Sequence, residues 1–145
     1  MAFHFRLAAV LRLRQNLEER DLHLLEQTQH EIARVVQQME ELRAQQHSSH
    51  ALQQRELAGG TPAINLHFGE QVRRSLEQQK QTLGTKLAEL QRRRKMQLES
   101  YEDAKRKRQV MSDLRDRQQA AQEAQRVRQA QRAADDGFLA RHRQG

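Results

Sequence analysis

The chain has 145 residues and a formal charge of +7, with 36% hydrophobic and 3% aromatic residues, one Pro, and no Cys or Trp. A compact domain of this length needs about 45–50% apolar residues to fill one core, so the composition excludes an ordinary globular fold. The lack of Cys excludes a disulfide framework or a thiolate metal site and indicates a reducing compartment. No run of about 18 apolar residues could span a bilayer. The good helix formers Gln, Arg, Leu, Glu and Ala dominate, which leaves a coiled coil or a disordered polar chain.

Apolar residues spaced three and four apart predict a first helix over about 3–57, about 80 Å long. The early seam positions are Phe3, Leu7, Val10 and Leu17, with Arg14 interrupting them. After a slip of one residue, the expected seam continues through Leu25, Thr28, Ile32, Val35, Met39 and Leu42. The same register then reaches Gln46, Ser49, Gln53 and Glu56, so weak packing is predicted there.

A cluster of helix-breaking residues predicts a connection at about 58–65. Gly59, Gly60, Thr61 and Pro62 stand together, and Pro62 is the only proline. Gly suits a helix end and Pro a helix start, and Thr61 or Asn65 could cap the next helix. A short connection between two amphipathic helices predicts an antiparallel hairpin.

A second, longer helix is predicted over about 65–136, about 110 Å long, followed by a tail over 137–145. Its expected seam consists of Val72, Leu76, Leu83, Leu87, Leu90, Leu98, Tyr101, Val110 and Leu114. Gly69 and Gly84 lie inside this helix and each weakens it by about 1 kcal/mol. From about residue 120 the helix outruns its partner, and the apolar positions there are mostly Ala. The predicted fold is all-α, a single elongated domain made of a long two-helix antiparallel coiled-coil hairpin.

Charge is uneven, with a net −1 over 1–58 and +8 over 59–145. Two basic runs, Arg92 to Lys95 and Lys105 to Arg108, could neutralise phosphates, which gives a nucleic-acid-binding arm as an alternative function. Consecutive residues point all round a helix, however, and aromatic stacking residues and a reading module are absent. We interpret the runs as a solvated coiled-coil surface, with no nucleic acid expected as a partner. A generic scaffold coiled coil is a further alternative.

No constellation of catalytic residues is apparent, and a two-helix hairpin offers no enclosed pocket. The pairs His47 with His50 and His23 with His30 share helix faces, but no Cys or carboxylate set completes a metal site. We therefore expect no enzyme, no cofactor and no metal. The first seventeen residues hold Arg6, Arg12 and Arg14 without an acid, like a mitochondrial presequence. Because the apolar seam continues past them, we interpret this stretch as the start of the first helix.

The opening FRLAAVLRLRQNLEE, from Phe5 to Glu19, resembles the start of the FliJ family of flagellar type III export proteins. The ending DDGFLARH, from Asp135 to His142, follows a Gln- and Arg-rich helix and is similar to that family's acid-then-apolar ending. The chain length and the single Gly/Pro break fit as well. The resemblance spans the whole chain.

The resemblance implies a coiled coil similar to the central stalk of rotary ATP synthases. Such a protein binds the hexameric flagellar export ATPase and promotes its assembly, contacts the cytoplasmic domain of the export gate, and handles export chaperones. The implied location is cytoplasmic and peripheral at the inner membrane. The ATPase-binding residues would be Leu7, Val10, Leu11, Arg12 and Arg14, with the second helix beyond about Leu114 at the same end. The gate-binding residues would be Gln38, Leu42, Gln45, Val72, Leu76 and Gln79. Some family members carry aromatic residues on that surface, where this chain has Gln45 and Ser49.

Overall fold

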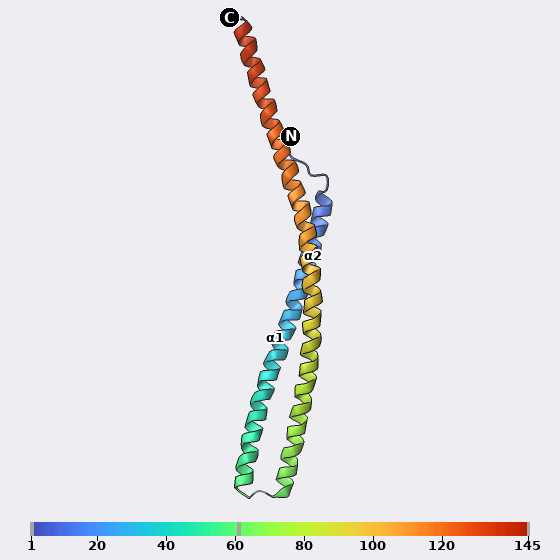
Figure 1. The fold of residues 1–145 in the computed structure, drawn as a ribbon, viewed down its shortest axis with the longest axis vertical. Coiled ribbons are helices and arrows are strands. Elements are labelled where there is room, and N and C mark those ends of the chain that lie inside the picture. The colour runs from blue at the N-terminus through green and yellow to red at the C-terminus, as the bar shows by residue number, and fades with distance from the viewer. Residues whose placement is uncertain (1, 61, 145) are drawn as a thin grey trace. The chain divides into compact units, whose positions relative to one another are not determined.

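A computed structural model describes residues 2–60 and 62–144. They form two helices, α1 at Ala8–Ala58 and α2 at Ala63–Gln144, joined by a short connection. The described residues contain no strand. The two helices run antiparallel as a hairpin in which α2 is the longer (Figure 1). The predicted all-α hairpin is confirmed.

The helix boundaries differ from those predicted at three places. Helix α1 begins at Ala8 rather than near residue 3, after a turn in which the Ala8 amide donates to the Phe5 carbonyl (3.1 Å). Helix α2 begins directly after Pro62, whose carbonyl accepts from the amides of Asn65 (3.1 Å) and Leu66. Asn65 therefore lies inside the first turn and is not the cap, while Thr61 lies outside the described residues.

The predicted non-helical tail is also wrong, because α2 continues through residues 137–144. No proline stands in this stretch, and a single Gly137 costs only about 1 kcal/mol of helix stability. The rings of Phe138 and His142, one helical turn apart, are stacked with their centroids 5.3 Å apart. Gly69 and Gly84 lie within α2 as expected, and neither ends it.

The connection between the helices depends on Gly60. Its φ of 74° lies in the left-handed region, which side chains with a Cβ rarely adopt. The preceding Gly59 amide donates to the Arg55 carbonyl (3.0 Å) and closes the last turn of α1. A glycine after the last helical residue is the usual way for a helix to end before a sharp turn.

The chain divides into two compact units, each described here by itself. The hairpin unit, Asp21–Ser100, contains the connection; the terminal unit consists of Met1–Arg20 and Tyr101–Gly145. In the hairpin unit, Leu25, Val35, Leu42 and Leu90 form the buried core. The predicted seam positions from Leu25 to Glu56 are all buried or half-buried, so this part of the seam is confirmed. Its last four positions are polar, as expected.

Polar groups also lie in the core of the hairpin unit. The Ser100 hydroxyl donates to the carboxylate of Asp21 (3.0 Å), which is itself buried. Gln97 is half-buried, and its Oε1 atom is buried without a hydrogen-bond partner among the described residues. Leu98, predicted for the seam, is 39% exposed instead. The expected position was wrong because Gln97, a polar residue, faces the other helix in its place.

The seam of the terminal unit differs in part from the predicted one: the predicted positions Phe3, Leu17, Tyr101 and Leu114 are half-buried. Phe5, Leu11 and Ala104 are buried, whereas Leu7, Val10 and Val110 are exposed. Positions 11, 14, 18, 21, 25 and 28 follow one another at steps of three and four, so no slip is needed. The apparent slip arose because the three successive positions between Leu11 and Leu25 carry the polar residues Arg14, Glu18 and Asp21. An apolar count along the sequence passes over such positions.

Helix α2 also has an unpaired stretch within the terminal unit. All side chains of residues 116–136 and 138–143 are exposed. The predicted unpaired stretch was placed from about residue 120, so it begins slightly earlier than expected. We call residues 116–143 the unpaired stretch below.

The glycines at positions 84 and 60 give a test of the helical backbone. We expect Gly84→Ala to stabilise the protein by about 0.5–1 kcal/mol, because Ala is the better helix former and a Cβ at Gly84 meets nothing within 4 Å. The matched variant Gly60→Ala should destabilise it by about 1–2 kcal/mol, the cost of a left-handed conformation. Urea unfolding followed by circular dichroism measures both. A destabilising Gly84→Ala would contradict the continuous packing of α2 around that residue.

Candidate functional site

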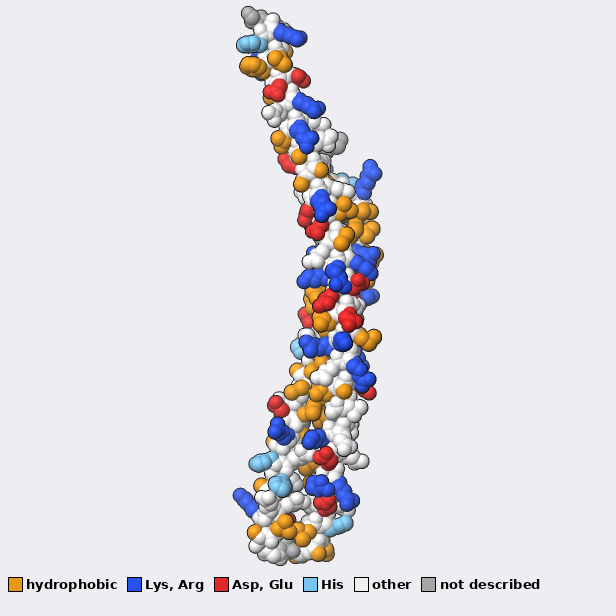
Figure 2. Space-filling model, in the orientation of Figure 1, with side chains coloured by type: hydrophobic (Ala, Val, Ile, Leu, Met, Phe, Trp, Pro, Cys, Tyr) orange, Lys and Arg blue, Asp and Glu red, His pale blue; other side chains and the backbone are white. Residues whose placement is uncertain are grey.

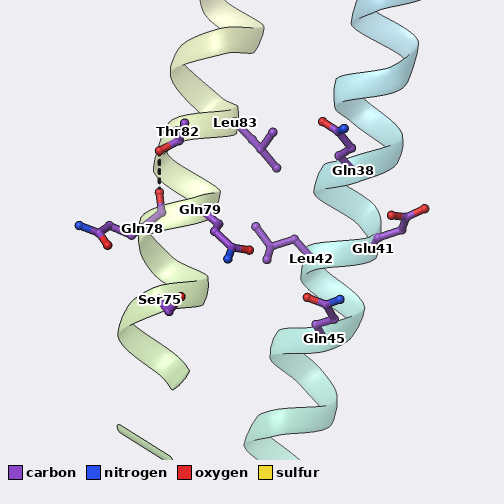
Figure 3. A pocket seen from close by; sticks show the side chains of 9 residues that line it. All are labelled: Gln38, Glu41, Leu42, Gln45, Ser75, Gln78, Gln79, Thr82 and Leu83. Carbon is purple, nitrogen blue, oxygen red and sulfur yellow. Dashed lines mark hydrogen bonds between the residues drawn. The ribbon is translucent and has the colours of Figure 1, made fainter. Parts of the chain in front are cut away.

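The hairpin unit carries a groove between its two helices, which we call the glutamine groove. It has a volume of ≈ 700 Å³ and is lined by Gln38, Glu41, Leu42 and Gln45 of α1 and by Ser75, Gln78, Gln79, Thr82 and Leu83 of α2 (Figure 3). On each helix these residues recur at steps of three and four, which places them on one face. The groove follows from the point where the apolar seam of α1 gives way to polar residues.

The glutamine groove has an apolar floor and polar residues along its sides. Leu42 and Leu83 reach from the two helices into the space between them, and Gln79 extends towards Leu42 (Figure 3). The Thr82 hydroxyl donates to the Gln78 carbonyl (3.0 Å) within its own helix. Glu41 is the only charged residue of the lining. In a chain that is 31% charged, the groove is a nearly uncharged surface with hydrogen-bonding amides at its edge.

The residues predicted to bind the export gate are partly brought together. Gln38, Leu42, Gln45 and Gln79 line the glutamine groove, and the three glutamines are exposed. Val72 and Leu76 line two smaller hollows nearer the connection, with Phe68 beside Val72 and His50 beside Leu76. Leu42 is only 5% exposed, so it forms the floor of the groove and offers a partner little surface.

Four large apolar side chains near the connection were missed by sequence reasoning. Leu52, Leu57, Ile64 and Phe68 are each more than half exposed, and apolar side chains cluster at this end of the hairpin in Figure 2. All four lie outside the predicted seam. This position could have identified them as exposed from the sequence, because an apolar residue outside the seam of a two-helix hairpin has no partner to cover it.

A second hollow in the hairpin unit was also missed; we call it the apolar hollow. Its apolar lining is Val36, Met39, Leu42 and Leu87, and its charged lining is Glu40, Arg43 and Lys80. Leu42 is therefore shared between the apolar hollow and the glutamine groove. Val36 is 40% exposed. It follows Val35 in sequence and lies beside the seam, so the seam pattern did not single it out.

The residues predicted to bind the ATPase lie in the terminal unit. Leu7 and Val10 are 40% and 38% exposed, and Arg12 is exposed as well. Leu11 is buried and Arg14 is half-buried, so both contribute to the packing of the unit. Leu13 is 55% exposed and adds an apolar residue to this surface that was not predicted.

An ion pair of the terminal unit joins its two helical segments. Arg108 donates through Nε to Glu18 Oε2 (2.6 Å) and through a terminal nitrogen to Oε1 (3.2 Å), with side-chain exposures of 27% and 16%. This hydrogen-bonded guanidinium holds the pKa of Glu18 below its ordinary value and raises the pKa of Arg108. In the hairpin unit, Arg73 lowers the pKa of Glu70 in the same way, but that pair is exposed.

The two basic runs are partly engaged in ion pairs. Arg93 lies 3.7 Å from Glu31, and Lys107 lies 3.0 Å from Asp103; Arg108 pairs with Glu18 as described above. Such pairs are typical of a coiled-coil surface and reduce the charge available to phosphates. The runs belong to different units, the first to the hairpin unit and the second to the terminal unit.

The four histidines considered as metal ligands are exposed. His23 and His50 instead form hydrogen bonds to Gln27 (3.2 Å) and Gln54 (3.1 Å) one turn further along α1. Among the described residues, no three His, Asp, Glu or Cys side chains are grouped to hold a metal ion. Nor does the described part of the chain contain a helix that is both long and apolar enough to cross a membrane.

Two long antiparallel helices with grooves on their surfaces define this chain as a helical hairpin protein. Comparison with known protein families identifies which family this is. The family model described as the flagellar FliJ protein matches residues 3–145, and the chain therefore belongs to the FliJ family. No curated protein and no solved structure matches it. Membership places the chain in flagellar protein export, in a family of non-catalytic components.

Proposed function

We propose that this protein links the hexameric flagellar export ATPase to the export gate, with the terminal unit binding the ATPase and the hairpin unit binding the gate. The observation that carries the proposal is the separation of two unlike surfaces onto two units. The terminal unit exposes Leu7, Val10 and Leu13 around Arg12, whereas the hairpin unit presents the nearly uncharged glutamine groove. Two surfaces of different chemistry suit two different partners.

The charges of the terminal unit favour an acidic partner. Its residues sum to a net +6, whereas the hairpin unit sums to +1. A concentrated positive charge speeds association with a surface of opposite sign, and exposed leucine and valine side chains supply the apolar contact. This combination suits entry into an acidic channel of the ATPase ring, with promotion of ring assembly as the result.

The glutamine groove suits a partner with hydrogen-bonding groups and little charge. Its exposed amides both donate and accept, and Leu42 and Leu83 give an apolar floor. We assign this groove to the cytoplasmic domain of the export gate. Handling of export chaperones, and a location at the cytoplasmic face of the inner membrane, belong to the same proposal through the family.

The proposal is tested by separating the two activities with exposed residues. Purified protein is titrated into the export ATPase of the same organism, with hydrolysis rate and hexamer formation followed together, and its affinity for the gate domain is measured in parallel. Leu7→Asp with Val10→Asp should abolish ATPase activation and leave gate binding unchanged. Gln45→Glu with Gln79→Glu adds two charges beside Glu41 and should weaken gate binding about tenfold, with ATPase activation intact.

The matched control for the groove variant is Gln91→Glu, an equally exposed residue of α2 outside the groove. It should leave both activities unchanged. Equal loss of both activities in either double variant, with helicity retained, would contradict the assignment of two partners to two units. Wild-type protein without effect on ATPase rate or assembly would overturn the stalk function itself.

A further inference from the structure

The apolar hollow of the hairpin unit has the features of a docking site for a helix. Its apolar lining includes Val36, which is 40% exposed, and the half-buried Met39 and Leu87. Arg43 on α1 and Lys80 on α2 bring a positive charge to the hollow from each helix and outnumber the single negative charge of Glu40. A helix that fits would present large apolar side chains with an acidic residue next to them, because helices bind grooves through anchors at steps of three and four.

The unpaired stretch of α2 contains a segment with that chemistry. Asp135, Phe138, Leu139 and His142 follow the steps i, i+3, i+4 and i+7, so they lie on one face of the helix. Phe138 is 63% exposed although the His142 ring stacks on it, and Leu139 is 57% exposed. Asp135 and Asp136 put two negative charges one turn before these side chains and outnumber the single positive charge of Arg141 in this segment. We call residues 135–142 the acidic anchor.

We propose that the acidic anchor of one copy docks into the apolar hollow of a second copy, so that the protein associates head to tail with itself. Phe138 and Leu139 cover Val36 and Leu87, while Asp135 and Asp136 lie against Arg43 and Lys80. Lys80 and the acidic anchor belong to one uninterrupted helix, α2. Residues of one unbroken helix cannot fold onto each other, and the occupant therefore comes from a second copy.

Head-to-tail contacts have a consequence that symmetric contacts lack. Each copy offers one anchor and one hollow, so either the contacts close into a ring or the assembly stays open to growth. Leu42 forms part of both the apolar hollow and the glutamine groove. Self-association therefore places a second copy beside the surface that we assign to the export gate. The docking itself does not depend on that assignment.

Sedimentation velocity of the full-length protein alone, over a wide range of concentration, tests the proposal without ATPase or gate. The wild-type protein should associate as concentration rises. Phe138→Ala and Arg43→Glu should each weaken association by about tenfold or more, since each removes a central contact. The matched controls Val127→Ala, on the unpaired stretch, and Arg34→Glu, on α1 outside the hollow, should behave like wild type.

A double variant and a mixture of two single variants distinguish contact between an anchor and a hollow from other modes of self-association. Arg43→Glu with Asp136→Arg in one chain restores an opposite-charge pair and should recover association. A mixture of Phe138→Ala, which keeps its hollow, with Arg43→Glu, which keeps its anchor, should form a one-to-one complex at a concentration where each variant alone is monomeric. A wild-type protein that stays monomeric at every concentration would overturn the proposal. So would association that survives both single variants, or a mixture that remains monomeric, since the intact anchor of one variant would then fail to bind the intact hollow of the other.

Discussion

Leu42→Asp is expected to destabilise the protein by about 3–5 kcal/mol, because it removes a buried side chain and places a charge where water cannot solvate it. Leu42 is only 5% exposed. It is the last buried apolar residue of α1 before the seam turns polar, and it lines both the glutamine groove and the apolar hollow. Loss of this residue should therefore separate the helices from that point to the connection.

Urea unfolding followed by far-UV circular dichroism measures this effect. Leu42→Met conserves volume and should cost less than about 1.5 kcal/mol. Gln45→Glu, one turn away and exposed, should cost less still. If Leu42→Asp left stability near that of wild type, the packing of Leu42 between the helices would be disproved. The expected result also means that a loss of gate binding in Leu42→Asp says nothing about direct contact, and the exposed glutamines are the informative positions.

Glu18→Gln is expected to reduce the free energy of unfolding by about 1–3 kcal/mol at neutral pH, the range for a hydrogen bond to a charged partner. Glu18 accepts two hydrogen bonds from Arg108, and both side chains are largely shielded from solvent. The variant leaves Arg108 without its carboxylate. The matched control is Glu70→Gln: its pair with Arg73 is exposed and screened by solvent, so its loss should change stability much less.

The pH dependence gives this prediction a sign. Because Arg108 lowers the pKa of Glu18 in the folded protein, the unfolded chain binds the proton more readily. The stabilisation by the Glu18–Arg108 ion pair is therefore complete above the pKa of Glu in the unfolded chain, about 4.3. It is lost as pH falls through the lower pKa of Glu18 in the folded protein. The difference in stability between wild type and Glu18→Gln should shrink over that acidic range. A difference that does not change with acid would contradict the ion pair.

The sequence predicts the fold most accurately where the seam is apolar. Leu25 to Leu42 occupy the expected positions because burial of Leu, Ile, Val and Met drives helix pairing and leaves a clear period. The pattern failed around Glu18 and Asp21, which face the other helix although they are acidic. Their partners, Arg108 and Ser100, are about 80 to 90 residues away in sequence, and periodicity within one helix carries no information about such a partner.

The candidate site was predictable only in part for a related reason. The polar residues Gln46 and Ser49 in the sequence show where the apolar seam of α1 ends. The α1 residues that line the glutamine groove immediately precede them in sequence. The apolar hollow could not be found in the same way, because its lining combines Val36 and Arg43 of one helix with Lys80 and Leu87 of the other. Which residues of α2 face those of α1 depends on the register of pairing, which the connection and the core set together.

The half-buried seam from Gln46 to Glu56 is polar, and Leu42 is the last buried apolar residue of α1 before it. Because such a seam holds the helices weakly, we expect the hairpin to open first at the connection and to resist opening from Leu42 onwards. Backbone amides on the connection side of Leu42 should then exchange with deuterated solvent well before those near Val35 and Leu90. A partner that grips this end meets two loosely joined helices, and its binding energy is spent partly on ordering them. The end of the hairpin at the connection, where the helices separate most easily, is thus also the end whose conformation a bound partner can most readily change.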